Sequence, residues 1–321
     1  MVLRWLVTVA AVFAAAACGG KSTPPPEVGA PVAAPAPRVL APHETITATR
    51  MMKDVEWLCD PAREGRGFYQ PGGRAAADWI ERQFRDAGLD VSRQAIRNGA
   101  DNVIGVLAGG DSAVIVAAHY DHMGIDDDGA VHPGADDNAS GVAVMLAVMR
   151  AVADLEPGHT VVFIAFGAEE DGLRGSNVYV HDPLWPLDRT ALVVNFDMVG
   201  RNLFEMIGDG RRDAVAVVGL DTDETLSALA KRAAEAEDMY LLSGSAELIA
   251  RFGFDGRTDD WWFRKKDVRT VHFSTGLHRD YHKPTDTPDK LRPRQLTRIA
   301  RIATRIVVDV AELGPAREPS L

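Results

Sequence analysis

Five side chains of the kinds that bind metal ions stand beside apolar stretches at separate points of the sequence. They are His119, Asp137, Glu170, Asp197 and His282. Two imidazoles and three carboxylates are too many for one tetrahedral zinc ion that keeps an open position. They suit two divalent ions that share one bridging carboxylate, about 3.5–4 Å apart. The chemistry that such a pair supports is metal-assisted hydrolysis.

Buried strands are predicted to position most of these side chains. Three continuous apolar runs, typical of buried parallel strands, lead to His119, to the pair Glu169–Glu170 and to Asp197: residues 113–118, 160–166 and 190–196. A shorter strand, 270–273, leads into the loop that carries His282. Ligands collect beyond the carboxyl ends of strands in open α/β sheets, so we expect these residues to meet.

The stretch GADDNASG, residues 134–141, precedes an apolar segment of helical periodicity. Asp136, Asp137 or Asn138 would project from the loop that feeds this helix, and Ser140 is a plausible N-cap. A lone acidic turn of this kind is usually a solvated loop. The repetition of ligand residues at further strand ends favours a metal site instead.

The positions of two further groups of residues in the sequence indicate which members could bind metal. Glu169 and Glu170 are adjacent, so that one can bind metal while the other faces a substrate. Among the histidines after the last strand, His272 lies inside the strand and is predicted to be a core residue. His282, flanked by Tyr281 and followed by Asp286, is the better ligand than His278.

Five ordered motifs carry a resemblance to a known family: HYDHMG, GADDNASG, FGAEEDGLRGS, NFDMVGR and DYHKPTDT. In this order they resemble the di-zinc aminopeptidases of metallopeptidase family 28. That family also includes glutamate carboxypeptidases and, more distantly, glutaminyl cyclases. The resemblance covers roughly residues 50–308. It implies two Zn²⁺ ions per chain and peptide substrates.

The resemblance also implies a role for each site residue. One zinc would lie on His119, Asp137 and Asp197, and the other on Asp137, Glu170 and His282. Glu169 would be the general base, and Tyr281 would donate a hydrogen bond to the developing oxyanion. Asp121 would hold the ligand imidazole of His119, and Asp286 would likewise support the ligands. The peptide bond between Asp137 and Asn138 would be cis.

One stretch departs from the family pattern. Family members often have Ser-Asp-His before a Pro-Phe pair, whereas this chain has Thr258, Asp259, Asp260, Trp261, Trp262 and Phe263. The extra acid and the tryptophans would reshape a specificity pocket or form a packed surface turn. The sequence favours neither.

Several functions remain as alternatives to an aminopeptidase. A glutamate-carboxypeptidase-like enzyme is one, and a glutaminyl-cyclase-like enzyme is a weaker one because those enzymes use one zinc. A non-catalytic binding lipoprotein is disfavoured because all five ligands and Glu169 are present. The net charge of −11 argues against nucleic-acid binding. No obligatory protein partner is indicated.

The N-terminus is predicted to be an export signal. Residues 1–17 contain Arg4 and an apolar segment that ends in small residues before Cys18, which resembles a bacterial lipoprotein signal. A lipid on Cys18 would then be the chain's contact with a membrane, and Gly19 favours the outer membrane, facing the periplasm or the cell surface. Ala15, where such signals more often have Leu, leaves simple cleavage into the periplasm or medium as the alternative.

The remaining organisation follows from composition. Residues 18–43 are rich in Pro and Ala, which predicts an extended tether, and residues 316–321 are predicted to be a polar tail. Residues 44–315 are predicted to form one domain, which the family resemblance implies to be a zinc peptidase domain. Helices are predicted near 46–58, 73–87, 224–237 and 288–313, with further strands near 89–96, 102–107 and 214–220. The predicted strands and helices indicate an α/β fold with a mixed, mostly parallel central sheet flanked by helices. The family resemblance implies that this is a di-zinc phosphorylase/peptidase-like sandwich.

Overall fold

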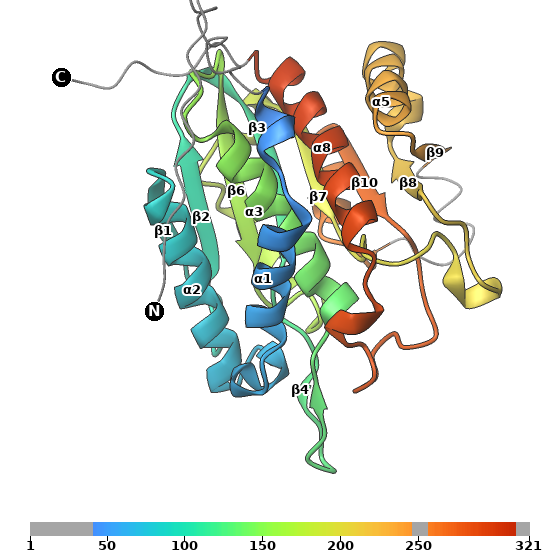
Figure 1. The fold of residues 1–321 in the computed structure, drawn as a ribbon. Coiled ribbons are helices and arrows are strands. Elements are labelled where there is room, and N and C mark those ends of the chain that lie inside the picture. The colour runs from blue at the N-terminus through green and yellow to red at the C-terminus, as the bar shows by residue number, and fades with distance from the viewer. Residues whose placement is uncertain (1–40, 246–255, 313–321) are drawn as a thin grey trace, which may run out of the picture. The chain divides into compact units, whose positions relative to one another are not determined.

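The computed structural model describes residues 41–245 and 256–312 (Figure 1). The predicted signal peptide, Cys18, most of the tether and the C-terminal tail lie outside these residues. No helix in the described ranges is long and apolar enough to span a membrane.

An eight-stranded sheet forms the centre of the fold, with the strand order β1-β2-β6-β3-β7-β10-β8-β9. β3 pairs in parallel with β6 and β7, β7 with β10, and β8 with β9, whereas the other neighbours are antiparallel. The predicted mixed, mostly parallel sheet is thus confirmed. The strands are β1 (Asp90–Gln94), β2 (Asn102–Leu107), β3 (Gly110–His119), β6 (His159–Phe166), β7 (Thr190–Phe196), β8 (Ala214–Val218), β9 (Tyr240–Gly244) and β10 (Thr270–Ser274).

Helices cover both faces of the sheet (Figure 1). One face packs against α1 (Ala48–Cys59), α2 (Pro71–Asp86), α3 (Gly141–Val152), α5 (Glu224–Ala236) and α8 (Pro293–Val310). The other face packs against α4 (Arg174–His181) and α7 (Asp260–Arg264). A two-stranded hairpin, β4 (Gly124–Ile125) and β5 (Val131–His132), projects beyond the sheet.

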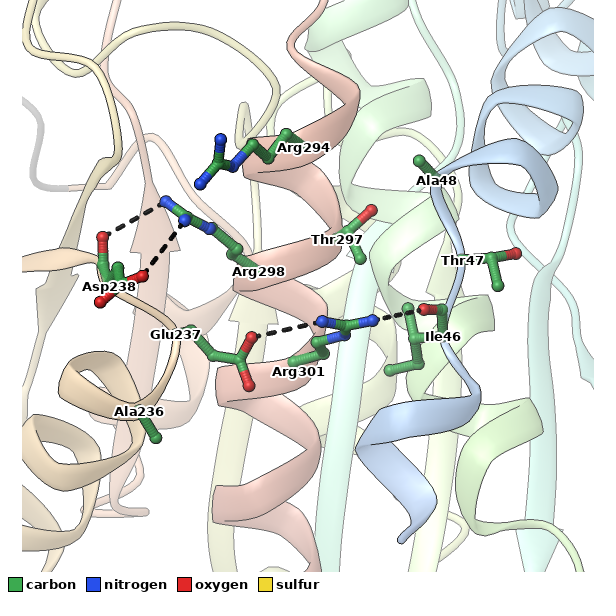
Figure 2. Close-up of a pocket in the computed structure, with 10 residues that line it drawn as sticks. All are labelled: Ile46, Thr47, Ala48, Ala236, Glu237, Asp238, Arg294, Thr297, Arg298 and Arg301. Atoms are coloured by element: carbon green, nitrogen blue, oxygen red, sulfur yellow. Dashed lines mark hydrogen bonds and ion pairs between the residues drawn. The ribbon is translucent and has the colours of Figure 1, made fainter. Parts of the chain in front are cut away.

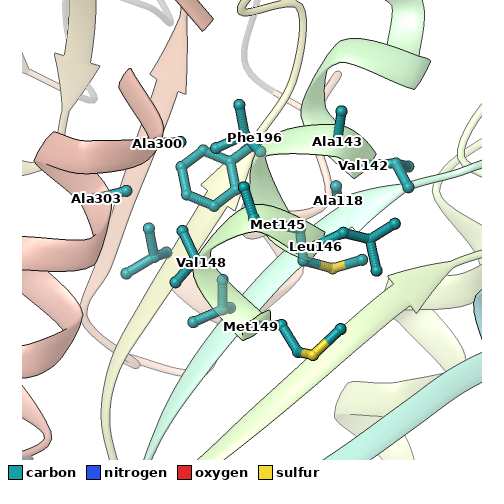
Figure 3. Close-up of a cluster of buried hydrophobic side chains, with 14 of the residues drawn as sticks. Ala118, Val142, Ala143, Met145, Leu146, Val148, Met149, Phe196, Ala300 and Ala303 are labelled. Carbon is teal, nitrogen blue, oxygen red and sulfur yellow. The ribbon is translucent and has the colours of Figure 1, made fainter. Parts of the chain in front are cut away.

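The α3 helix is the most deeply buried helix of the domain core. It is apolar nearly all round, as expected for a helix enclosed on every side. Met145, Leu146 and Met149 belong to the same buried apolar cluster as Phe196 of β7 and Ala300 of α8 (Figure 3). Burying each such Met or Leu side chain contributes about 1.5–3 kcal/mol. This packing fixes the start of α3, and therefore the acidic loop that precedes it.

The predicted C-terminal helix is wrong at its N-terminal end. Residues Pro288–Lys290 form a separate 3₁₀ turn, and α8 begins only at Pro293. A residue that precedes proline is disfavoured in the helical conformation, and Arg292 accordingly has φ −110° and ψ 88°. The strand β9 and the β4–β5 hairpin were not predicted.

Candidate metal centre

The sheet topology brings the predicted ligands to one edge. β3 lies between β6 and β7, and the three strands are parallel, so that their carboxyl ends meet. His119 is the last residue of β3, and Asp197 directly follows β7. Glu169 and Glu170 follow β6, and the loop with His282 follows β10, the other neighbour of β7.

Asp137 lies between two histidines and directs one oxygen toward each. Its Oδ1 is 3.5 Å from His119 Nε2, and its Oδ2 is 3.3 Å from His282 Nε2. His119 Nε2 is also 3.4 Å from Asp197 Oδ1, and His282 Nε2 is 3.0 Å from Glu170 Oε2. All five residues predicted as ligands therefore meet in space, and Asp137 occupies the shared position.

The arrangement of these side chains suits the binding of two cations better than it suits hydrogen bonds among the side chains themselves. Two groups of three residues each bring potential ligand atoms within 4.8 Å of one another. One group is His119, Glu169 and Asp197, and the other is His122, Asp137 and Glu170. Among the described residues, the buried atoms Asp137 Oδ2 and His282 Nε2 have no hydrogen-bond partner. Four buried or half-buried carboxylates so close together are costly without bound cations.

Electrostatics show the same excess of negative charge. Burial raises the pKa of Glu169, and the nearby carboxylates of Asp197 and Glu170 raise it further. Burial and the charge of Glu170 raise the pKa of Asp137. Burial opposes a charge on His282, yet Asp137 and Glu170 raise its pKa to about 10. Without metal, Asp137, Glu169 and His282 are thus driven to take up protons. Burial opposes a charge on Glu170 as well, yet its contacts with His122 and His282 lower its pKa.

His122 was not predicted as a site residue, although it lies in the HYDHMG motif. Its Nδ1 is 2.8 Å from Glu170 Oε1 and 3.7 Å from Asp137 Oδ2. The only signal in the sequence was its position three residues after His119. A histidine just past a strand gives no indication of which way its ring points.

The two predicted supporting acids act mainly on backbone. Asp121 accepts hydrogen bonds from the backbone N–H groups of Glu169 (3.1 Å) and Glu170 (3.3 Å). Its carboxylate is 3.8 Å from His119 Nδ1, and its backbone carbonyl is closer, at 3.3 Å. Asp286 accepts from the backbone N–H groups of Asp136 and Asp137. Both acids therefore orient segments that bear ligands.

The turn before α3 has the predicted cis peptide bond between Asp137 and Asn138. Ser140 occupies the N-cap position but makes no capping hydrogen bond, because its hydroxyl donates to the carbonyl of Asp136. Asn138 caps instead: its Oδ1 accepts from Gly141 N at 3.0 Å and from Met198 N at 3.2 Å. Asn138 thereby joins the Asp137 turn to the segment after Asp197.

Arg66 holds two of the ligand-bearing segments together from outside the cluster. Its fully buried guanidinium donates to the backbone carbonyls of Tyr120, Pro133, Gly134 and Leu58, at 2.6–2.9 Å. Tyr120 follows His119, and Gly134 starts the turn that carries Asp137. The positions of these two ligands therefore depend on a residue far from both in the sequence.

Tyr281 stacks on the ring of His282, with centroids 3.8 Å apart. Burial raises the pKa of its hydroxyl, and Asp137 and Glu170 raise it further, so that the hydroxyl keeps its proton. It is therefore available as a hydrogen-bond donor beside the cluster.

The stretch that departs from the family pattern divides into two parts. Asp259 is buried near the cluster, and burial raises its pKa to about 7, with Asp121 and Asp197 adding to the effect. Asp260 accepts from Thr258 and Arg264 and faces His272 at 3.4 Å. Trp261 and Trp262 meet edge to face, 4.6 Å apart. Asp260 and the tryptophans thus belong to the packed helix α7, whereas the charge of Asp259 acts on the cluster, where it raises the pKa of Glu169.

A groove of about 610 Å³ lies away from this cluster, between α8, the end of α5 and residues 46–48 (Figure 2). Arg298 and Arg301, two of the arginines that line it, already have partners. Arg298 lies 3.7 Å from Asp238, and Arg301 lies 3.6 Å from Glu237 and donates to the carbonyl of Ile46. The ion pairs join α8 to the residues that follow α5, and the hydrogen bond from Arg301 joins α8 to Ile46. The residues that line the groove bring together no ligand set of the kind described above.

The chain is similar in sequence to known proteins. Aminopeptidase YwaD of Bacillus subtilis (strain 168) is 28% identical over 213 residues, which are 62% of this chain and 41% of that protein. The chain thus matches less than half the length of that relative.

Solved structures show the same fold. BSAP, a zinc aminopeptidase from Bacillus subtilis, aligns with a TM-score of 0.69 and 18% identity over 82% of this chain and 95% of that one. The glutaminyl cyclase of Porphyromonas gingivalis aligns with a TM-score of 0.65 and 18% identity, over 82% of this chain and 98% of that one.

The sequence model of peptidase family M28 matches residues 102–307. This chain belongs to peptidase family M28.

Proposed function

We propose that this protein is a zinc-dependent aminopeptidase that removes N-terminal residues from peptides. The observation that carries the proposal is the position of Asp137, which directs one carboxylate oxygen toward His119 and the other toward His282. A carboxylate shared in this way is the hallmark of a two-metal site.

Two sets of residues would hold the ions. His119, Asp137 and Asp197 would hold one ion, and Asp137, Glu170 and His282 the other. Imidazole and carboxylate ligands suit Zn²⁺. When bound, two such ions would supply Lewis acidity that polarises a scissile carbonyl and makes a water acidic enough to react at neutral pH.

Glu169 is the residue best placed to move protons. Its Oε2 lies 4.0 Å from His119 Nε2, at the edge of the cluster. Burial and neighbouring carboxylates raise its pKa, which brings the group closer to the pH at which a general base works best. Glu169 would accept a proton from the attacking water and pass it to the leaving amine.

Tyr281 would stabilise the negative charge that develops on the carbonyl oxygen. Its hydroxyl keeps its proton because burial and the carboxylates around it raise its pKa. A hydrogen bond aimed at developing charge in a partly buried site contributes more than the same bond in water.

The names of the relatives support this activity, with one ambiguity. YwaD is named an aminopeptidase and BSAP a zinc aminopeptidase. A glutaminyl cyclase shares the fold, so the fold alone does not decide between hydrolysis and cyclisation. The complete set of five ligands favours the two-metal hydrolase.

A substrate panel tests the proposal. The purified protein is offered aminoacyl amides, N-blocked peptides and N-terminal glutaminyl peptides, each with and without a chelator. We expect chelator-sensitive release from unblocked amines only. Cleavage of blocked peptides would indicate a carboxypeptidase or an endopeptidase. Cyclisation of glutaminyl peptides would indicate a cyclase, and the absence of any turnover would indicate a binding protein.

We also propose that the protein is exported and anchored through a lipid on Cys18. The support is the sequence of residues 1–18, with its single Arg, apolar segment and small residues before the cysteine. Mass spectrometry of the N-terminus tests this: a diacylglyceryl cysteine is expected, and a free N-terminus at another residue would show simple cleavage.

A further inference from the structure

We propose that His122 is a positioning residue that holds Glu170 for its metal and does not itself bind the ion. It would donate a hydrogen bond from Nδ1–H to one carboxylate oxygen and leave the other oxygen facing His282. This inference rests on the proposed two-metal function, which assigns Glu170 and His282 to one ion.

The two oxygens of Glu170 have different neighbours. Oε1 lies 2.8 Å from His122 Nδ1, and Oε2 lies 3.0 Å from His282 Nε2. The backbone N–H of Glu170 donates to Asp121 at 3.3 Å. Glu170 is therefore fixed at its backbone by Asp121 and at its carboxylate by His122, with a single oxygen directed at the ligand histidine.

The unpartnered nitrogen of His122 decides between the two roles. An ionised carboxylate only accepts, so that the proton of the short contact belongs to His122 Nδ1. Nε2 is buried and has no partner among the described residues, which suits an unprotonated nitrogen. If Nδ1 bound a metal, the proton would move to Nε2 and would be buried without an acceptor.

His119 shows the pattern expected of a true ligand. A metal-binding histidine ordinarily donates its other ring N–H to an oxygen. His119 Nε2 points at the carboxylates, and its Nδ1 lies 3.3 Å from the backbone carbonyl of Asp121. His122 Nε2 has no such partner among the described residues, and in this it differs from His119.

The surroundings of His122 fix its ring. The side chain is fully buried, and its backbone N–H donates to the carbonyl of Arg66 at 3.3 Å. A Cβ at Gly134 would lie 2.5 Å from ring atoms of His122, and Gly134 has φ +56°. The absence of a side chain at Gly134 thus makes the space in which the imidazole lies against Glu170.

Three variants of His122 in the full-length holoenzyme test the proposal. His122→Asn keeps an N–H donor near the place of Nδ1, whereas His122→Gln is of similar size but places its amide near Nε2. His122→Ala removes the side chain. His132→Ala is the matched control, because that ring lies 6.4 Å from His122 and contacts Asp126 instead.

Competition with a chromophoric chelator measures the affinity for each of the two zinc ions. One of these affinities should fall about 10- to 100-fold in the Gln and Ala variants, because the proposal concerns only the ion assigned to Glu170. The Asn variant should recover most of it, and the control should match the wild type. An equal loss of zinc affinity in the Asn, Gln and Ala variants would make His122 a ligand, and no loss in the Ala variant would make it a packing residue. If the Ala variant fails to fold, the comparison of the Asn and Gln variants still decides between the two roles.

A crystal structure of each metal-free variant separates this proposal from the proposed function. Glu170 should keep its side-chain conformation in His122→Asn and change it in His122→Gln. An unchanged Glu170 in both would overturn the role of His122. A wild-type protein that binds no zinc would instead overturn the two-metal function, and the crystal structures would still show whether His122 fixes Glu170.

Discussion

Two glutamates of this protein have opposite electrostatic surroundings. Glu81, on α2, accepts from Arg85 at 2.7 Å and from Arg93 at 2.8 Å, and these hydrogen bonds lower its pKa. Glu169, beside the strand ends, is buried among other carboxylates, and its pKa is raised. One acid has cations supplied by the chain, and the other does not.

The difference shows why the strand-end cluster points to metal. An exposed ion pair such as Glu81–Arg85 is satisfied by its own partners and contributes little. In the cluster, carboxylates face imidazoles and one another, and no guanidinium or ammonium group is paired with Asp137, Glu169, Glu170 or Asp197 among the ion pairs of the described residues. The missing positive charge must come from outside the chain.

The largest expected effect comes from Glu169→Gln. Removing the proton acceptor should lower kcat for an aminoacyl amide by about 10²- to 10⁴-fold. Metal content should stay unchanged, because Glu169 is not assigned as a ligand. Kinetics and elemental analysis on the same sample check this. If Glu169→Gln lost metal while Glu170→Gln kept it, the two roles would be reversed.

Arg66→Met extends the comparison to a buried cation that is held by carbonyls. The substitution leaves four carbonyl groups without their donor, so we expect the free energy of unfolding to fall by about 2–4 kcal/mol. Urea unfolding of the metal-free protein measures it. A loss below about 0.5 kcal/mol, the range of ordinary surface substitutions, would contradict the role assigned to this residue.

Asp137→Asn tests the shared carboxylate. Both ions should be lost or bound about 100-fold more weakly, because an amide is a poorer ligand and carries no charge; 100-fold corresponds to about 2.7 kcal/mol. The matched control is Asp136→Asn, whose carboxylate accepts from Gly200 and faces His278 instead. Equal loss of metal in both variants would show that Asp137 has no special position.

Glu81→Gln should have the smallest effect, at most about 1 kcal/mol at pH 7, because solvent screens the pair. The folded-state pKa of Glu81 lies below its ordinary value of 4.5, so its stabilising contribution is present above pH 4.5 and is lost as the pH falls through that lower value. Urea unfolding at pH 7 and pH 3 should show the difference between wild type and variant shrinking at pH 3. A difference that stayed constant would contradict the lowered pKa.

The sequence was informative where a local pattern determines the structure. Continuous apolar runs predicted β7 with the bounds observed and placed His119 at the end of β3. The strand predicted near 102–107 also has the observed bounds of β2. Parallel neighbours put their carboxyl ends at one edge, so the meeting of the four candidate ligands that follow strands could be predicted. Asp137 comes instead from the turn before α3. The cis peptide bond between Asp137 and Asn138 was predicted from the family resemblance.

The features that the sequence did not reveal depend on contacts between distant residues. Arg66 reaches the carbonyls of Tyr120 and Gly134, more than fifty positions away, and no local pattern predicts that. The contact of His122 with Glu170 depends on a ring orientation set by tertiary packing. Ser140 had the residue type of a helix cap, yet Asn138 took the role because its amide also reaches Met198.

Locating zinc in the crystal is the most direct test of the metal site. Diffraction data collected on the zinc-loaded protein on both sides of the zinc absorption edge should show two anomalous peaks, about 3.5–4 Å apart, on either side of Asp137. One peak should lie beside His119 and Asp197, and the other beside Glu170 and His282. No peak at this edge of the sheet, or a single one that Asp137 does not touch, would contradict the two-metal site.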